Sequence, residues 1–134
     1  MKVHLNLTTR DLSKSVAFYQ TLLAAAPTKH FADYALFLTE KPGLELALDA
    51  DPAVKIAEGA HYGIVVDSLD QVDGAIARLQ GSGYRADIER DETCCYAKQT
   101  KVWTTDPDGR RWETYFVIEE AETRDAEAPA CCAS

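Results

Sequence analysis

Residues 3–23 of the chain, VHLNLTTRDLSKSVAFYQTLL, align with residues 60–80, AHYGIVVDSLDQVDGAIARLQ, at an offset of 57. Each copy begins with alternating apolar and polar residues, which is typical of a half-buried strand. Each then continues with apolar residues at spacings of three and four, which is typical of an amphipathic helix. The equivalent pairs include His4 and His61, Leu12 and Leu69, and Leu22 and Leu79. The chain is therefore predicted to contain one structural unit twice.

Three further strands are predicted after each helix, over residues 27–32, 34–40 and 44–50 and over residues 84–91, 98–105 and 110–118. The second helix has a capping-box start at Ser68 and Gln71, and Gly81 and Gly83 close it. The order βαβββ, repeated, predicts an α+β fold in which two modules, 1–57 and 58–118, form a curved mixed sheet around a shared cleft. Residues 119–134 are predicted to be an acidic tail whose composition favours disorder.

The composition restricts the class of protein. A chain of 134 residues fits one domain with a sizeable core. The net charge is −8, and half of it comes from the tail, where five acidic residues stand against one arginine. No basic stripe indicates a nucleic-acid partner. No apolar run approaches the roughly 20 residues of a membrane span, and the first residues lack the apolar core of a signal peptide, so we expect a cytoplasmic protein.

Strand alternation places metal-competent side chains on the faces turned away from the predicted helices. His4, His61 and Glu113 each lie on a strand opposite the apolar residues that should cover a helix. Two histidines and one carboxylate with open positions are the ligand set of non-haem Fe(II) oxygen chemistry. A single histidine on a strand is more often structural, but the equivalence of His4 and His61 in the repeat favours ligands. His30 has no such counterpart and is predicted to lie at the surface.

Glu45 leaves an alternative open. LELAL (44–48) matches WETYF (112–116) within the repeat, which pairs Glu45 with Glu113. Glu45 is then either a fourth ligand of a site suited to Ni²⁺, Zn²⁺ or Mn²⁺ acting as Lewis acid, or a solvated residue after the Pro42-Gly43 turn.

All four cysteines occur as adjacent pairs, Cys94-Cys95 and Cys131-Cys132. Adjacent cysteines bridge each other poorly, because their Cα atoms lie about 3.8 Å apart and relaxed disulfides need roughly 4.4–6.8 Å. Such a pair is suited to holding one soft, thiophilic atom, although paired cysteines also occur as small buried hydrophobes. The charged neighbours of Cys94-Cys95 favour a ligand or redox role there. The role of Cys131-Cys132 stays open.

The doubled unit with His4, His61 and Glu113 resembles the vicinal oxygen chelate superfamily, which includes glyoxalase I, extradiol dioxygenases and fosfomycin or bleomycin resistance proteins. The resemblance covers residues 1–118. TCCYA (93–97) and KVWTTDPDGRRWETY (101–115) resemble, more specifically, the branch of organoarsenical carbon–arsenic lyases and cadmium-induced proteins. The stretches SVAFYQTLL, PTK and DYALF fit the same branch.

This resemblance implies an Fe(II)-dependent enzyme that uses dioxygen to cleave the carbon–arsenic bond of methylarsenite or aromatic arsenicals. The products are arsenite and, from a methyl group, formaldehyde. The resemblance implies His4, His61 and Glu113 as metal ligands, with Ni, Zn or Mn as other divalent metals that the site accepts. It also implies that Cys94 and Cys95, on the loop before the penultimate strand, hold trivalent arsenic. Members of the superfamily often pair as dimers, and some build the cleft between chains, so two questions stay open: whether the chain forms a homodimer, and whether His4, His61 and Glu113 of one site come from one chain.

Two other functions stay open at this point. One is a resistance protein that binds cadmium or arsenic through its thiols without turnover. The other is a glyoxalase-type metalloenzyme that uses Glu45 as a fourth ligand. Lys101 and Trp103 are candidates for lining the approach to the site, and interior packing explains Trp103 equally well.

Overall fold

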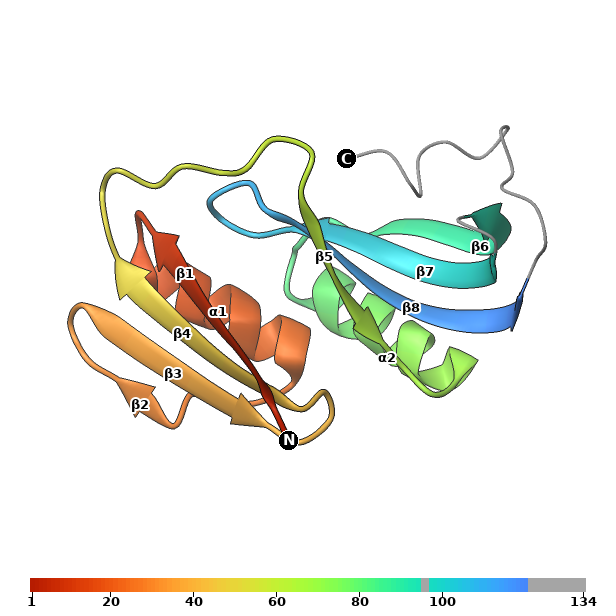
Figure 1. Ribbon diagram of the computed structural model, residues 1–134, viewed down its shortest axis with the longest axis horizontal. Helices are drawn as coiled ribbons and strands as arrows, with labels where there is room; N and C mark the ends of the chain where they lie inside the picture. Colours follow the sequence, from red (N-terminus) through yellow and green to blue (C-terminus); the bar gives the residue numbers. More distant parts are fainter. Residues whose placement is uncertain (95–96, 121–134) are drawn as a thin grey trace. The chain divides into compact units, whose positions relative to one another are not determined.

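A computed structural model describes residues 1–94 and 97–120 of the chain (Figure 1). The chain divides into two compact units. The first comprises residues 1–56 together with residues 106–109. The second comprises residues 57–105 and the described residues from 110 onward. The first unit thus includes the turn at 106–109, although the residues on both sides of this turn in the sequence belong to the second unit.

Each unit is one βαβββ module with a four-stranded mixed sheet, so the predicted α+β class and the repeated element order are confirmed. The strand orders are β1-β4-β3-β2 and β5-β8-β7-β6, and in both sheets the first pair is parallel and the others antiparallel. The elements of the first unit are β1 (Val3–Thr9), α1 (Leu12–Leu23), β2 (Lys29–His30), β3 (Tyr34–Thr39) and β4 (Leu44–Ala50). Those of the second are β5 (His61–Val65), α2 (Leu69–Gly81), β6 (Asp87–Cys94), β7 (Ala97–Thr105) and β8 (Arg111–Glu120).

Both helices begin at side-chain caps. The Asp11 carboxylate accepts a hydrogen bond from the Lys14 amide at 3.1 Å, and the Ser68 hydroxyl accepts one from the Gln71 amide at 3.3 Å. The Gln71 side chain in turn accepts from the Asp67 amide at 2.6 Å. These contacts satisfy amides that have no partner inside a helix. The capping-box start predicted at Ser68 is thus confirmed, with the returning bond one residue earlier than in the usual motif.

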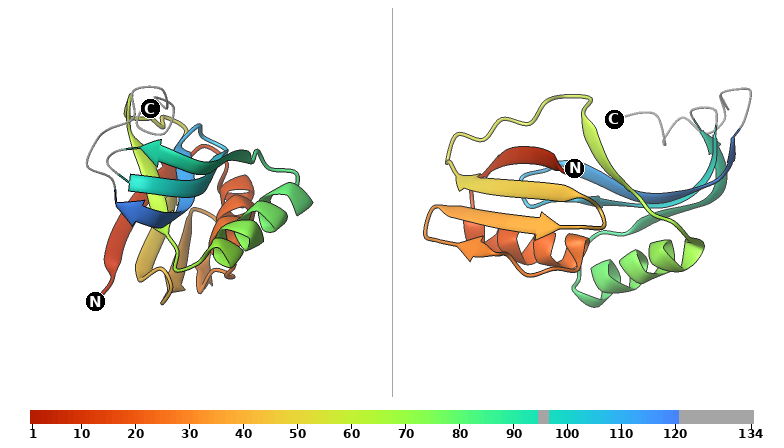
Figure 2. Two further views of the ribbon diagram at one scale, coloured as in Figure 1. Left: turned by 90° about the vertical axis from the view of Figure 1, so that its right-hand side faces the viewer. Right: turned by 60° about the horizontal axis from the view of Figure 1, so that its bottom comes forward.

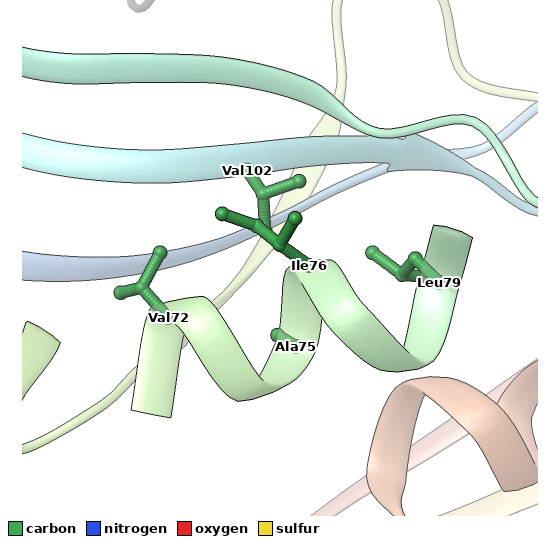
Figure 3. Close-up of a cluster of buried hydrophobic side chains, with 5 residues drawn as sticks. All are labelled: Val72, Ala75, Ile76, Leu79 and Val102. Carbon is green, nitrogen blue, oxygen red and sulfur yellow. The ribbon is translucent and has the colours of Figure 1, made fainter. Parts of the chain in front are cut away.

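The core of the second unit lies between α2 and β7 (Figure 3). Val72, Ala75, Ile76, Leu79 and Val102 form a buried apolar cluster, against which Val66 and Phe116 also pack. The predicted alternation along β5 and β8 is therefore confirmed, since Val66 and Phe116 lie on the helix-covered side. Figure 2 shows β6, β7 and β8 curving together, with α2 on the outer side of the bend. The next residues along each strand, such as Lys101 and Trp103, lie on the opposite face.

The first unit combines an apolar core with a buried polar cluster. Its core includes the fully buried Phe18, Phe37, Leu46 and Leu48. The turn at 106–109 contributes two buried carboxylates. Asp106 Oδ2 accepts from the Tyr19 hydroxyl at 2.6 Å, and Asp108 Oδ1 accepts from the Arg10 amide at 3.0 Å. The turn therefore supplies acceptors from a distant part of the sequence, Asp108 just before α1 and Asp106 to Tyr19 in the second half of the helix.

Two strand ends differ from the sequence predictions. β6 runs through Cys94, so this cysteine ends a strand instead of lying in the following loop, and Cys94 pairs with Ala97 across the hairpin. β8 continues through Glu120, two residues beyond the predicted end of the second module. Cys95, Cys131 and Cys132, with the predicted tail from residue 121, lie outside the described residues. His30 is exposed, as expected. In the described part of the chain, neither helix is long and apolar enough to cross a membrane.

Candidate metal centre

His61 and Glu113 meet on the face of the second sheet that is turned away from α2. Nε2 of His61 lies 3.7 Å from Oε2 of Glu113, across the parallel pair β5–β8. The Glu113 side chain is buried, whereas His61 is about one third exposed. Oε2 of Glu113 is buried and forms no hydrogen bond within the described residues. A buried carboxylate oxygen in that state is costly in a metal-free protein, and a cation would relieve the cost.

Burial raises the pKa of the Glu113 carboxyl above its ordinary value of 4.5. The positive charge of Lys101 and the neighbouring His61 act in the opposite direction and offset part of this rise. Nζ of Lys101 lies 3.5 Å from Oε1 of Glu113, and the side chains of both residues are almost completely buried. The two oxygens of Glu113 thus have different surroundings: Oε1 faces an ammonium, and Oε2 faces an imidazole.

Aromatic rings contact both Lys101 and His61, the two residues next to the Glu113 carboxylate. The Lys101 ammonium lies 5.5 Å from the centre of the Trp103 ring and 5.2 Å from that of Tyr115. The Trp103 ring also meets the His61 ring edge-on, with centroids 5.2 Å apart, and its Nε1 donates to Glu89 at 3.0 Å. The guanidinium of Arg111 lies 4.3 Å from the centre of the Trp103 ring. Trp103 therefore packs against the candidate ligand His61 and against two cations.

A glycine on β5 makes room for the Glu113 side chain. Gly63 is the register partner of Glu113. A Cβ atom on Gly63 would lie 3.2 Å from Cγ of Glu113 and 3.1 Å from the Tyr115 ring. Both distances are shorter than ordinary van der Waals contact, so a larger residue would displace one of these side chains. A glycine inside a strand often marks such a close approach.

The first unit holds the other predicted candidates, His4 and Glu45. Nδ1 of His4 lies 2.9 Å from Oε1 of Glu45, and both side chains are about half exposed. The register corrects the equivalence predicted from the sequence. His4 pairs with Glu45 across β1–β4, whereas His61 pairs with Arg111 and Glu113 pairs with Gly63. Glu45 is thus the structural counterpart of Arg111, two residues before Glu113, and the predicted equivalence of Glu45 and Glu113 is wrong.

Within the described residues, no group of three or more His, Cys, Asp or Glu side chains lies close enough to hold one metal ion. The structure brings together His61 with Glu113, and His4 with Glu45, as separate pairs. The His61–Glu113 pair fits a metal. Two ligand atoms each about 2.1 Å from one ion, at angles of about 90–120°, lie about 3.0–3.6 Å apart, which is close to the observed 3.7 Å.

Residues 3–114 match the Glyoxalase/Bleomycin resistance protein/Dioxygenase superfamily. The chain belongs to this superfamily. Members of the superfamily bind divalent metal ions, and the buried, metal-competent oxygen of Glu113 agrees with that property.

Individual superfamily members are similar to the chain over most of its length. A protein of Thermomonospora curvata named "Trivalent organoarsenical cleaving enzyme" is 39% identical over 132 residues, which cover 98% of this chain and 87% of the relative. The "Cadmium-induced protein CadI" of Mycobacterium tuberculosis is 38% identical over 141 residues, covering 98% and 92%. A glyoxalase/bleomycin resistance protein/dioxygenase from Alicyclobacillus acidocaldarius has the same fold, with a TM-score of 0.72 at 18% identity over 89% of this chain and 92% of that chain.

Sequence reasoning missed two residues that lie at the candidate site, Gly63 beside Glu113 and Arg111 over the Trp103 ring. A glycine inside an otherwise regular strand is a readable signal for Gly63. Arg111 gave no such signal, because its position over the Trp103 ring depends on the pairing of β7 with β8.

Proposed function

We propose that the protein is an Fe(II)-dependent carbon–arsenic lyase that uses dioxygen to degrade trivalent organoarsenicals to arsenite, and so confers arsenic resistance. The observation that carries the proposal is the 39% identity, over nearly the whole length of both chains, to a relative named as a trivalent organoarsenical cleaving enzyme. The His61–Glu113 pair and the adjacent thiols of Cys94 and Cys95 supply the two kinds of ligand that such a reaction needs.

In this proposal Cys94 and Cys95 bind the substrate. Trivalent arsenic is soft, and thiolates are the protein ligands that suit soft ions. Two thiolates on neighbouring residues hold the arsenic atom at two points and leave its carbon substituent free. Cys94 ends β6 and pairs with Ala97, the first residue of β7, the strand that carries Lys101 and Trp103. The substrate is thereby held in a fixed orientation relative to this strand, which converts a bimolecular encounter into an oriented one.

In this proposal His61 and Glu113 are two of the three metal ligands, and His4 is the third because the resemblance to the vicinal oxygen chelate superfamily implies it. When bound, Fe(II) supplies the site for dioxygen chemistry, because three protein ligands leave coordination positions open. The edge-on contact of Trp103 fixes the His61 ring. Gly63 on β5 has no side chain and so leaves room for the Glu113 side chain. His61 thus presents its Nε2 and Glu113 its Oε2 to the metal, in a fixed geometry.

The overall reaction balances without a further reactant. One methylarsenite and one dioxygen give one arsenite and one formaldehyde. The carbon–arsenic bond breaks, one oxygen atom of dioxygen ends on the carbon and the other on the arsenic, and arsenic stays trivalent. The methyl carbon supplies the electrons that reduce dioxygen.

A second candidate function is sequestration of cadmium or arsenic without turnover. The 38% identity to a cadmium-induced protein favours it, because Cd²⁺ also prefers thiolate ligands. In that case the thiols would be sufficient and the His61–Glu113 pair would have no role in resistance.

Two substitutions separate the two sites. Cys94→Ser is expected to lose methylarsenite binding while it keeps the iron content of the anaerobically loaded protein. His61→Ala is expected to lose iron while methylarsenite binding survives. His30→Ala, which changes an exposed histidine, is the matched control and should change neither. Full turnover by Cys94→Ser would refute the proposed role of the thiols.

A further inference from the structure

The strongest unassigned feature of the second unit is the buried cation of Lys101. Its side chain is 2% exposed, although lysine is almost never fully buried unless it is paired. The ammonium is 3.5 Å from Oε1 of Glu113 and lies near the faces of the Trp103 and Tyr115 rings. Both kinds of contact compensate a buried ammonium. The group is thus fixed at one end of the Glu113 carboxylate.

The opposite end of that carboxylate is unsatisfied within the described residues. Oε2 is buried, forms no hydrogen bond, and lies on the side of His61 Nε2 at 3.7 Å. A carboxylate can bind a metal through one oxygen or through both. An ammonium at Oε1 disfavours the second mode, because the ammonium and a metal ion repel each other at the same oxygen.

We propose that Lys101 is a positioning residue that keeps Glu113 a one-oxygen ligand: its ammonium occupies Oε1 and leaves Oε2 to the metal. This inference rests on the proposed role of Glu113 as a metal ligand. Its functional consequence is that one more coordination position stays available for dioxygen. The charge of Lys101 also compensates the buried carboxylate, so that a single residue both stabilises Glu113 and limits how it binds.

Trp103 supports this arrangement from the side. Its ring contacts the Lys101 ammonium and the His61 ring, while its Nε1 is anchored on Glu89. One rigid side chain therefore contacts both the candidate ligand His61 and the cation that lies beside Glu113. Outer-shell partners of this kind orient metal ligands in many proteins.

The test uses Co(II) as a spectroscopic probe of coordination, in the full chain with all four cysteines replaced by serine so that thiolates do not take the cobalt. The visible absorption of Co(II) weakens when its coordination number rises. Lys101→Met is expected to bind Co(II) and to show weaker visible absorption than the parent protein, because Glu113 becomes free to bind through both oxygens. Lys98→Met removes the same charge from the same strand and should leave the spectrum unchanged.

Identical spectra for Lys101→Met and the parent protein would overturn the proposal, and so would a spectral change of the same size in Lys98→Met. If Lys101→Met does not fold, Lys101→Gln replaces it, because the amide is polar enough for the buried position but lacks the charge that repels a metal at Oε1; a change in the same direction is expected. With the cysteines restored and iron bound, Lys101→Gln should lower turnover by about tenfold or more. Because cobalt is bound here without an arsenical, the spectrum decides the role of Lys101 even if the chain does not cleave arsenicals.

Discussion

The surroundings of the Glu113 carboxylate explain how a buried acid can persist in this fold. One oxygen faces Lys101, and the other is buried without a hydrogen bond among the described residues. The first contact stabilises the ionised form, whereas burial opposes it. The net effect is a raised pKa of the Glu113 carboxyl, which means that the ionised carboxylate is destabilised in the metal-free protein.

This imbalance predicts how stability depends on pH. In the metal-free protein, the pKa of Glu113 is above its ordinary 4.5, so the folded state binds this proton more tightly than the unfolded state does. Its contribution to stability is therefore complete below pH 4.5 and is lost as the pH rises through the folded pKa. Glu113→Gln does not titrate at this position. The free energy of unfolding of the wild type, relative to that of Glu113→Gln, should fall between pH 4 and pH 8; denaturant titrations at several pH values measure it. A difference that grows with pH would contradict the account.

The contact of Gly63 with Glu113 gives a second prediction at this scale. Gly63→Ala places a methyl group 3.2 Å from Cγ of Glu113, so the carboxylate must shift. We expect the affinity for Fe(II) or Co(II) to fall by about tenfold, as for other changes that disturb the orientation of a ligand. Calorimetric titration of the anaerobic protein measures it.

Gly74→Ala is the matched control for this change. Gly74 lies inside α2, where an added Cβ would meet only the end of the Arg78 side chain at 3.6 Å. This variant should keep the metal affinity and gain up to about 1 kcal/mol of stability, because alanine favours the helix. An unchanged affinity in Gly63→Ala would show that the carboxylate does not depend on the glycine.

The turn between β7 and β8 belongs to a different unit from the two strands that it connects. By its contacts it belongs to the first unit, where Asp108 is a buried acceptor just before α1 and Asp106 is one for Tyr19 within the helix. The sequence Asp106-Pro107-Asp108-Gly109 by itself indicates a turn and none of these contacts. Its two carboxylates are also the acceptors for Tyr19 and Arg10, residues that are distant in the sequence.

Removal of one of these bonds tests the importance of the turn for the first unit. Tyr19→Phe deletes the hydroxyl that donates to Asp106 at 2.6 Å in a fully buried position. We expect a loss of about 1–3 kcal/mol in the free energy of unfolding, since a buried acceptor loses a donor. Tyr34→Phe, on β3 and half-buried, should cost less. Equal small effects in both variants would mean that the turn contributes little; urea titrations of both variants provide the comparison.

The element order was predictable because it depends on local signals. Alternation, helical spacing and caps all occur within short stretches, and the repeat strengthened each of them. The predicted equivalence of Glu45 and Glu113 in the repeat was wrong for a physical reason. A slip of two residues keeps every side chain on the same face of a strand, so the apolar pattern cannot detect it. Only the register of β4 against β1 and of β8 against β5 reveals it.

At the scale of the whole molecule, each of the two units holds a histidine–glutamate pair, and the pairs are not equivalent. His4 and Glu45 are half exposed, whereas Glu113 is buried beside Lys101. The sequence predicted His61 and Glu113 as ligands because strand parity and the repeat placed both on the face away from the helix. It could not predict the cluster around them, since the contacts of Trp103 with Lys101, His61 and Arg111 join three different strands.

We propose that this chain turns over an organoarsenical at a metal site formed with His61 and Glu113. The most direct test loads the protein with Fe(II) without oxygen and then admits air and an excess of methylarsenite. We predict arsenite and formaldehyde in equal amounts over many turnovers, and none from Glu113→Gln. Uptake of methylarsenite in a fixed ratio to the protein, with no formaldehyde released, would contradict the account and leave sequestration as the function.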